Sequence, residues 1–205
     1  PKKENIPTRE EYNGNVSSTG PRACYDESKR FGETICEVFA EKFKMPIRIV
    51  RPFNNYGPGI NLKDKRVVAD FASSVISEKN IEIYSNGKPT RTFCYISDAI
   101  VGYFKAIFYE AFDIFNIGIQ EPEISIFELA EIYKRIGFNA FNRNIDIILK
   151  PPPEKNYLTD NPLRRCPNIE KARSKLNYNP EINVDEGVER YLSYLIANGE
   201  VIWSQ

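Results

Sequence analysis

The hydrophobic residues of this chain follow two spacings, one typical of helices and one typical of short strands. Between residues 22 and 44, apolar side chains recur three and four positions apart, which predicts an amphipathic helix ending at Met45-Pro46. Residues 47–50 (IRIV) are rich in β-branched side chains and are bounded by turn formers, so we expect a strand there. A helix followed directly by a strand is typical of the parallel sheet of an α/β fold.

The same two patterns alternate through the rest of the chain. Ser97-Asp98 and Ser125 are expected to cap the helices that follow them. A Gly/Pro/Asn-rich stretch at residues 54–61 and the triple proline at 151–153 are expected to be loops. The remaining pattern predicts strands at 81–84, 92–95, 114–118 and 146–149, and helices at 67–78, 97–109, 125–136, 169–176 and 185–198.

The composition is that of a globular chain without a strong net electrostatic field. The 205 residues, of which 41% are hydrophobic, suffice for a sizeable core. Twenty-eight basic residues balance 28 acidic ones, so no general attraction favours nucleic acid or an anionic membrane as a partner. Charged residues interrupt the apolar stretches, and we expect neither a membrane span nor a signal peptide.

The numbers of cysteine and histidine residues limit which catalytic and metal-binding chemistries this chain can perform. The four cysteines are scattered without a C-x-x-C pair, which is typical of reduced thiols in a cytoplasmic protein. The absence of histidine excludes Ser-His and Cys-His nucleophilic chemistry within this chain and disfavours a structural zinc site, so we expect no metal. Acid–base work falls to Tyr, Lys, Arg, Asp or Glu.

A tyrosine and a lysine one helical turn apart are the main catalytic candidates. Tyr25 and Lys29 share a face of the helix expected at 22–44, and a nearby cation favours a phenolate. The spacing alone is a weak indication, because about one such pair is expected by chance. Tyr84 and Lys88 have it too, around a turn sequence. We interpret Tyr25 and Lys29 as a catalytic pair; the alternative is two ordinary residues on a helix surface.

Two segments carry a resemblance to a known family. Residues 20–34 (GPRACYDESKRFGET) and 51–58 (RPFNNYGP) resemble the nucleotide-sugar branch of the extended short-chain dehydrogenase/reductases, the NAD-dependent epimerase/dehydratase family. The similarity is greatest to UDP-glucuronate decarboxylases and dTDP-glucose 4,6-dehydratases. It implies that Tyr25, as phenolate, takes the proton of a sugar 4-hydroxyl while hydride passes to NAD. It also implies that Lys29 lowers the Tyr25 pKa and binds the nicotinamide ribose.

The resemblance supplies three substrate-binding candidates. Asn54 follows the strand in the second segment and would contact the sugar or diphosphate; the alternative is a simple turn residue. Arg91, between a turn and a strand, offers a donor fork that suits a phosphate, unless it is a solvated surface arginine. Arg165 matches the arginine of a D-x-P-x-x-R-x-P-x-I stretch, and its alternative is pairing with a surface carboxylate.

The family's catalytic Ser/Thr and its glycine-rich nucleotide-binding turn have no counterpart in the sequence. Ser17 and Ser18 precede the Tyr25 helix, and we interpret them as surface residues. Nothing matches a G-x-x-G-x-x-G turn, so we expect the C-terminal portion of a longer enzyme.

The expected fold is α/β, with the C-terminal part of a Rossmann-type parallel sheet and a smaller discontinuous α/β region. Residues 1–56 and 90–124 are assigned to the NAD-binding domain, and residues 57–89 and 125–205 to the substrate-binding region.

The resemblance implies NAD-dependent modification of a UDP- or dTDP-linked sugar. Oxidation at C4 would be followed by decarboxylation, dehydration or epimerisation, and a UDP-glucuronate decarboxylase-like reaction is favoured. The enzyme would be a homodimer formed through the Tyr25 helix. The alternative function is that of a non-catalytic fragment or interaction protein that retains a nucleotide-diphosphate pocket and associates through an exposed sheet edge.

Overall fold

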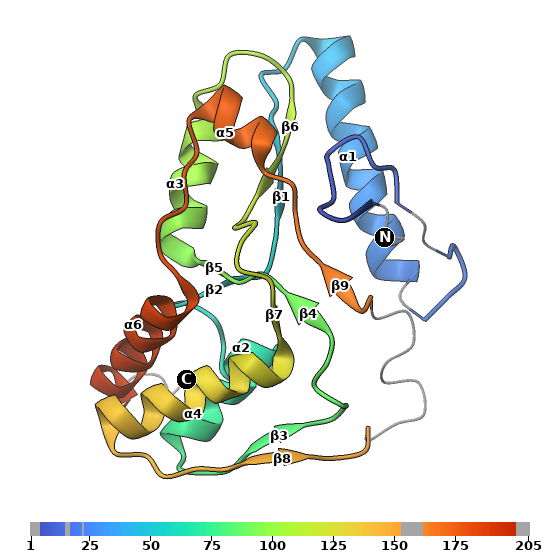
Figure 1. The fold of residues 1–205 in the computed structure, drawn as a ribbon. Helices are drawn as coiled ribbons and strands as arrows, with labels where there is room; N and C mark the ends of the chain where they lie inside the picture. Colours follow the sequence, from blue (N-terminus) through green and yellow to red (C-terminus); the bar gives the residue numbers. More distant parts are fainter. Residues whose placement is uncertain (1–4, 15–16, 22, 153–161, 200–205) are drawn as a thin grey trace.

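The chain has the α/β fold expected from its sequence, with short parallel strand pairs covered by helices (Figure 1). The structure is a computed structural model and describes residues 5–14, 17–21, 23–152 and 162–199. No helix within these ranges is long and apolar enough to cross a membrane. All four cysteines lie in this part of the chain, and none of them forms a disulfide.

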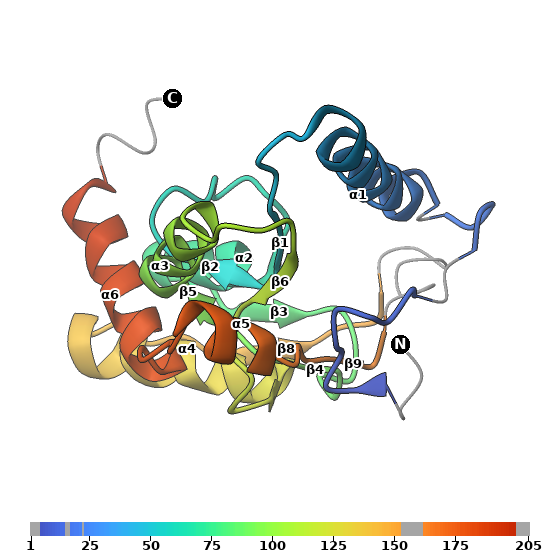
Figure 2. The same cartoon turned by 90° about the horizontal axis from the view of Figure 1, so that it is seen from above.

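A pair of parallel strands organises one half of the molecule. Strand β1 (Ile49–Pro52) pairs with β6 (Ile114–Ile117), which places Ile49 opposite Ile114 and Pro52 opposite Ile117. Helix α1 (Ala23–Phe43) lies on one side of this pair and α3 (Ile96–Ile107) on the other (Figure 2). Helix α5 (Glu170–Leu176) packs against β6 and α3.

The core of this half lies between β6, α3 and α5. Phe115, Ile117 and Ile169 are completely buried there. Helix α3 approaches the sheet closely because a glycine stands at the contact: a Cβ at Gly102 would lie 2.8 Å from the Ile117 side chain. Burial of these side chains against one another fixes α3 and α5 on the sheet.

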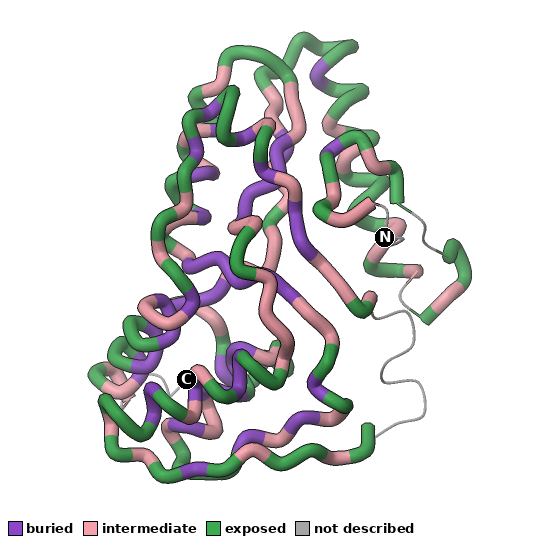
Figure 3. Tube along the Cα trace, viewed as in Figure 1, coloured by how far each residue is buried: buried purple, intermediate pink, exposed green. Residues whose placement is uncertain are grey.

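A second core fills the other half of the molecule. Helices α2 (Val67–Ile76), α4 (Ile126–Phe141) and α6 (Val184–Ala197) pack together beside the parallel pair β3 (Ile81–Ile83) and β8 (Ile147–Leu149). Tyr133 is completely buried, and its hydroxyl donates to the Val68 carbonyl at 3.1 Å. Figure 3 shows buried residues on the inward sides of these helices.

Two-residue strands join the halves. Strand β2 (Asn55–Tyr56) pairs in parallel with β5 (Cys94–Tyr95). Strand β4 (Thr90–Arg91) pairs antiparallel with β7 (Ile124–Ser125) and parallel with β9 (Arg164–Arg165). Of the strand expected at 92–95, only Cys94–Tyr95 is observed; Thr90–Arg91 forms a separate short strand before that range, with other partners.

The helix caps confirm one expectation and correct another. Ser125 caps α4 in a full capping box, in which its Oγ accepts the Glu128 N–H at 3.1 Å and Glu128 accepts the Ser125 N–H at 2.7 Å. The cap predicted at Ser97-Asp98 is wrong, because α3 already begins at Ile96 without a side-chain cap. Asp98 instead accepts the N–H groups of Glu181 and Ile182, at 3.1 and 2.9 Å.

Candidate functional site

A cavity of about 1230 Å³ lies where α1 faces the carboxyl end of β1. Its wall is formed by residues of α1, by the loop that follows β1, by the start of α2 and by Arg165 of β9. Ligands of open α/β sheets bind beyond the carboxyl ends of the strands, and the cavity occupies that position.

An arginine–carboxylate fork fixes α1 to the sheet at the wall of this cavity. Arg51 of β1 donates from Nε and Nη2 to the two carboxylate oxygens of Glu33 at 2.7 and 2.6 Å, and from Nη1 to the Glu10 carbonyl at 2.8 Å. The hydrogen bonds to Glu33 raise the pKa of Arg51 above its usual value. Sequence analysis did not single out either partner, although both lie within the two motif segments that carry the resemblance.

Tyr25 and Lys29 both line the cavity, as neighbours on one face of α1. The Lys29 ammonium lies 5.5 Å from the centroid of the Tyr25 ring, within the range of a cation–π contact. The Tyr25 side chain is 58% exposed. The structure therefore brings the predicted pair together; its catalytic role stays a prediction.

The loop after β1 brings two amide side chains to the cavity. Asn54 has a left-handed backbone (φ 46°), and its Nδ2 donates to the Thr92 carbonyl at 2.9 Å. Asn55 donates to the Tyr103 hydroxyl at 2.5 Å, while its buried Oδ1 has no hydrogen-bond partner among the described residues. Asn54 and Asn55 thus have their amide side chains held by contacts within the protein at the wall of the cavity.

The two arginines predicted to bind substrate lie next to each other but in different surroundings. Arg91 and Arg165 are register partners of β4 and β9, and Arg165 lines the cavity. Arg91 is 8% exposed and is not part of the lining; its guanidinium donates to the carbonyls of Thr90 and Pro162, both at 2.7 Å. Burial, together with the charge of Arg165, lowers the pKa of Arg91 to about 10.

The remaining candidates lie outside the site. Ser17 and Ser18 are exposed and do not line the cavity, which agrees with their interpretation as surface residues. A further residue that lines the cavity was not a candidate: Arg66, directly before α2, pairs there with Asp64 at 2.6 Å. Sequence analysis missed Arg66 because none of the quoted motifs includes it. Within the described ranges, no three His, Cys, Asp or Glu side chains come together in a group that could hold a metal ion.

The wall of the cavity combines a phenol and an ammonium from α1 with an arginine from β9 and two amides from the loop after β1. Such a cavity can bind an anionic group through Arg165 and present a neighbouring hydroxyl to Tyr25. The nearby guanidinium of Arg91 adds positive charge behind Arg165, which further favours an anion.

Comparison with known sequences gives a consistent set of relatives. Residues 1–118 match the family described as "NAD dependent epimerase/dehydratase family". UDP-glucuronic acid decarboxylase 1 of Arabidopsis thaliana is 36% identical over 187 residues, which are 91% of this chain and 41% of that protein. The Xenopus tropicalis protein of the same name is 32% identical, over 92% of this chain and 42% of its own length. The chain thus spans less than half the length of these relatives.

Solved structures share the fold over most of the chain. An epimerase from Methanothermobacter thermautotrophicus superposes with a TM-score of 0.79 at 24% identity, over 92% of this chain and 54% of that one. The UDP-glucuronic acid 4-epimerase from Bacillus cereus, crystallised with UDP-glucuronic acid and NAD, gives a TM-score of 0.70 at 26% identity, over 91% and 57%. The β1–β6 sheet is therefore part of a Rossmann-type fold.

Proposed function

The chain belongs to the NAD dependent epimerase/dehydratase family, and from this premise we propose that it forms the acid–base and sugar-binding side of an NAD-dependent enzyme that modifies a nucleotide sugar. One observation carries the proposal: Tyr25, Lys29, Asn54 and Arg165 line a single cavity. The favoured reaction is decarboxylation of a UDP-glucuronate-type substrate after oxidation at C4, because the relatives at 32–36% identity have the name of such decarboxylases.

Tyr25 has the proton-transfer role in this proposal. Its phenolate would remove the proton of the sugar 4-hydroxyl, and Lys29, 5.5 Å from the ring, stabilises the negative charge on the phenol oxygen. NAD, when bound, supplies the acceptor for the hydride that leaves C4. Tyr25 and Lys29 are the residues of this chain that would meet the nicotinamide end of the cofactor.

The residues of this chain fit only the nicotinamide end of NAD. The cavity offers a phenol and an ammonium, but the sequence contains no glycine-rich turn of the kind that holds a pyrophosphate. We therefore assign the binding of the dinucleotide phosphates to polypeptide outside this chain.

The substrate diphosphate is assigned to Arg165, and the sugar to the part of the cavity that Asn54 lines. Arg165 supplies a planar donor fork at the cavity wall. Arg91 receives a different role from the one first expected: through its bonds to the Pro162 and Leu163 carbonyls it positions the segment that leads to Arg165.

The competing proposal is a non-catalytic protein that retains the nucleotide-diphosphate pocket. It requires only the anion-binding part of the cavity, where Arg165 lines the wall. The homodimer and the cytoplasmic location expected from the sequence belong to the enzyme proposal and stay predictions. Exposed apolar residues of α1, such as Phe31 and Phe39, support the dimer.

The test compares Tyr25→Phe with Tyr194→Phe, an exposed tyrosine on α6, in the longest natural form of the chain. With UDP-glucuronate and NAD, Tyr25→Phe should lower turnover by at least about 100-fold, because the phenol hydroxyl is lost. Binding of UDP, measured by calorimetry, should be unchanged in both variants.

The possible outcomes separate the two proposals. Equal turnover of Tyr25→Phe and wild type would contradict the acid–base role. UDP binding that Arg165→Gln weakens, with no turnover by the wild type, would favour the non-catalytic protein.

A further inference from the structure

A sheet of three very short strands carries the arginine that lines the cavity. Strand β4 lies in the middle of this sheet, with β7 on one side and β9 on the other. Strand β9 consists of Arg164 and Arg165 alone, and β4 is its one strand partner within the described ranges. So short a ladder provides few backbone hydrogen bonds, and the place of Arg165 at the cavity wall must therefore depend on side-chain contacts as well.

Positive charges face each other across the β4–β9 ladder. Arg165 stands opposite Arg91 in the register of the two strands. Burial and, after it, the charge of Arg165 lower the pKa of Arg91 to about 10. Because like charges at opposed positions destabilise strand pairing, the ladder needs a negative charge nearby.

The carboxylate of Glu123, directly before β7, provides this charge. It accepts hydrogen bonds from Nε and Nη2 of Arg164 at 3.0 and 2.5 Å, and the hydroxyl of Thr90 also donates to it. The bonds from Arg164 hold the pKa of Glu123 below its usual value, so the carboxylate is ionised at neutral pH. One side chain next to β7 thus ties β4 and β9 together.

The alternation of side chains along β9 separates two tasks. Successive residues of a strand direct their side chains to opposite faces of the sheet. Arg164 meets Glu123, and the next residue, Arg165, lines the cavity. Glu123 therefore holds the strand from the face opposite to the one that Arg165 uses.

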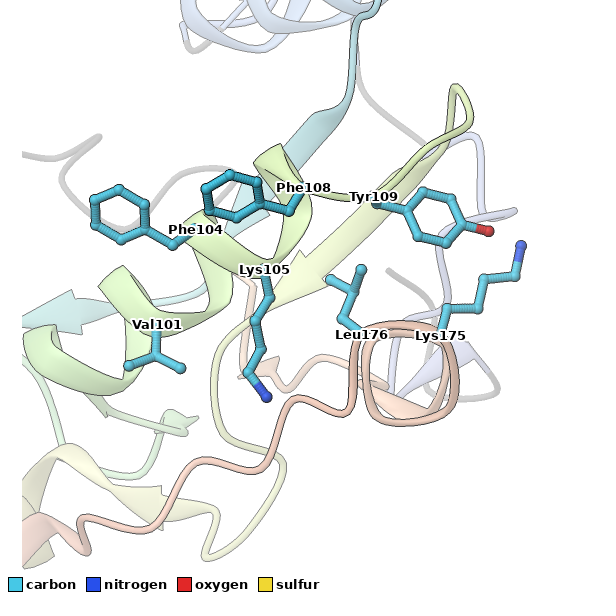
Figure 4. A pocket seen from close by; sticks show the side chains of 7 residues that line it. All are labelled: Val101, Phe104, Lys105, Phe108, Tyr109, Lys175 and Leu176. Atoms are coloured by element: carbon cyan, nitrogen blue, oxygen red, sulfur yellow. The ribbon is translucent and has the colours of Figure 1, made fainter.

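A second cavity shows a different use of a carboxylate. This cavity, of about 410 Å³ beside α5, is lined in part by Lys105 and Lys175 (Figure 4). There Asp113 pairs with the lining residue itself, at 2.6 Å from the Lys175 ammonium, and so offsets the charge that the cavity presents. In β9 the fork is made to Arg164, the neighbour of the lining residue, so the carboxylate fixes the strand.

We propose that Glu123 is a positioning residue for substrate binding, which holds β9 so that Arg165 meets the diphosphate of a nucleotide sugar. The inference rests on the proposed function, in which the diphosphate is assigned to Arg165. Positioning and simple electrostatics predict opposite signs. Loss of the Glu123 charge alone would strengthen the binding of an anion nearby, whereas loss of its hold on β9 weakens that binding.

The test measures the affinity for UDP by calorimetry, in the longest natural form of the chain. Glu123→Gln should raise the dissociation constant about three- to fivefold, the size of effect that a partly exposed ion pair allows. Glu121→Gln is the matched control, because it changes the net charge equally, two residues earlier and at an exposed side chain. It should leave the affinity unchanged.

A second variant breaks the same contact from the other side. Arg164→Lys keeps the positive charge but removes the planar donor fork, and should raise the dissociation constant at least about twofold. With UDP-glucuronate and NAD, Glu123→Gln should raise KM by the factor seen for UDP and change kcat by less than about twofold. Thermal unfolding verifies that each variant folds.

A double-mutant cycle separates positioning from a general structural role. In the Arg165→Gln background, Glu123→Gln should weaken UDP binding no further, because the side chain that it positions is gone. A merely structural role would weaken binding by the same factor in both backgrounds.

Several results would overturn the inference. Tighter UDP binding by Glu123→Gln would show that Glu123 acts only through its charge. Unchanged affinity, an equal effect of Glu121→Gln, or an undiminished effect in the Arg165→Gln background would also contradict it. Where wild type binds UDP and Arg165→Gln weakens that binding, these results leave the proposed function standing. A wild type that does not bind UDP would overturn both.

Discussion

The α2–α4–α6 region and helix α1 differ sharply in how they are held. The three packed helices bury whole side chains, among them Tyr133, Tyr191 and Leu192, each with no exposed surface. Helix α1 buries Ala40 and is tied to the sheet mainly by the Arg51–Glu33 fork. The region that stabilises the fold is thus separate from the helix that carries Tyr25 and Lys29, whose position depends on a few polar contacts.

The largest expected loss of stability comes from a substitution in the packed α2–α4–α6 region. Leu192→Ala should lower the free energy of unfolding by about 2–5 kcal/mol, because it leaves a cavity among fully buried side chains. Ile35→Ala on α1, at a residue that is 39% exposed, should cost less than about 1 kcal/mol. Urea unfolding measures both. Similar losses in the two variants would contradict the contrast between the regions.

A substitution that removes the attachment of α1 to the sheet should have an intermediate effect on stability. Arg51→Gln leaves the Glu33 carboxylate without its fork, and should favour local opening of α1 by about 1–2 kcal/mol. Amide exchange within α1 should then quicken about tenfold, while exchange in α4 stays unchanged. Arg66→Gln is the control, because it breaks the exposed pair with Asp64. Unchanged exchange in α1 would show that other contacts hold the helix.

The smallest expected effect on stability comes from an ion pair in the β4–β7–β9 sheet, which lies between the two regions. The hydrogen bond from Arg164 holds the pKa of Glu123 below its usual value. A depressed folded-state pKa adds stability above the unfolded pKa of about 4.3, and that stability is lost as pH falls through the lower folded value. Because Arg164 is 39% exposed, screening limits the gain to less than about 1 kcal/mol.

Arg164→Gln should therefore lower stability at neutral pH and flatten its decline between about pH 5 and 3. Unfolding titrations at several pH values measure the slope. Arg173→Gln, which breaks an exposed pair with Glu170, serves as the control and should leave the slope unchanged. An acid limb that is equally steep in Arg164→Gln and wild type would contradict this account.

Elements determined by local sequence were predictable. The apolar period located α1 and α4, and Ser125 was correctly predicted as a cap, because its partner Glu128 lies within one helical turn. Asp98 was misassigned because its partners, Glu181 and Ile182, lie far along the chain. Strands β4, β7 and β9 were missed for the same reason, since pairing with distant segments defines them.

The candidate site shows the same limit. Tyr25, Lys29 and Asn54 could be named from contiguous motifs, and the structure places them at one cavity. Motif position could not reveal that Arg91 turns to backbone carbonyls, because the accepting residues lie some seventy positions further along the chain. The motifs also could not indicate that Arg51 matters more than other charged residues, because its paired hydrogen bonds to Glu33 form only when α1 packs against β1.

The sheet connections also have a consequence for how fast this chain folds. Every described strand pair joins distant segments: Ile49 with Ile114, Asn55 with Cys94, and Thr90 with Arg164. Such pairings close long loops, and their entropy is lost before any ladder hydrogen bond forms. Packing of α2, α4 and α6 closes loops of similar length, so each helix can form early but their assembly cannot. The cavity, bounded by β1 and β9, is therefore expected to be completed only when these distant segments have met.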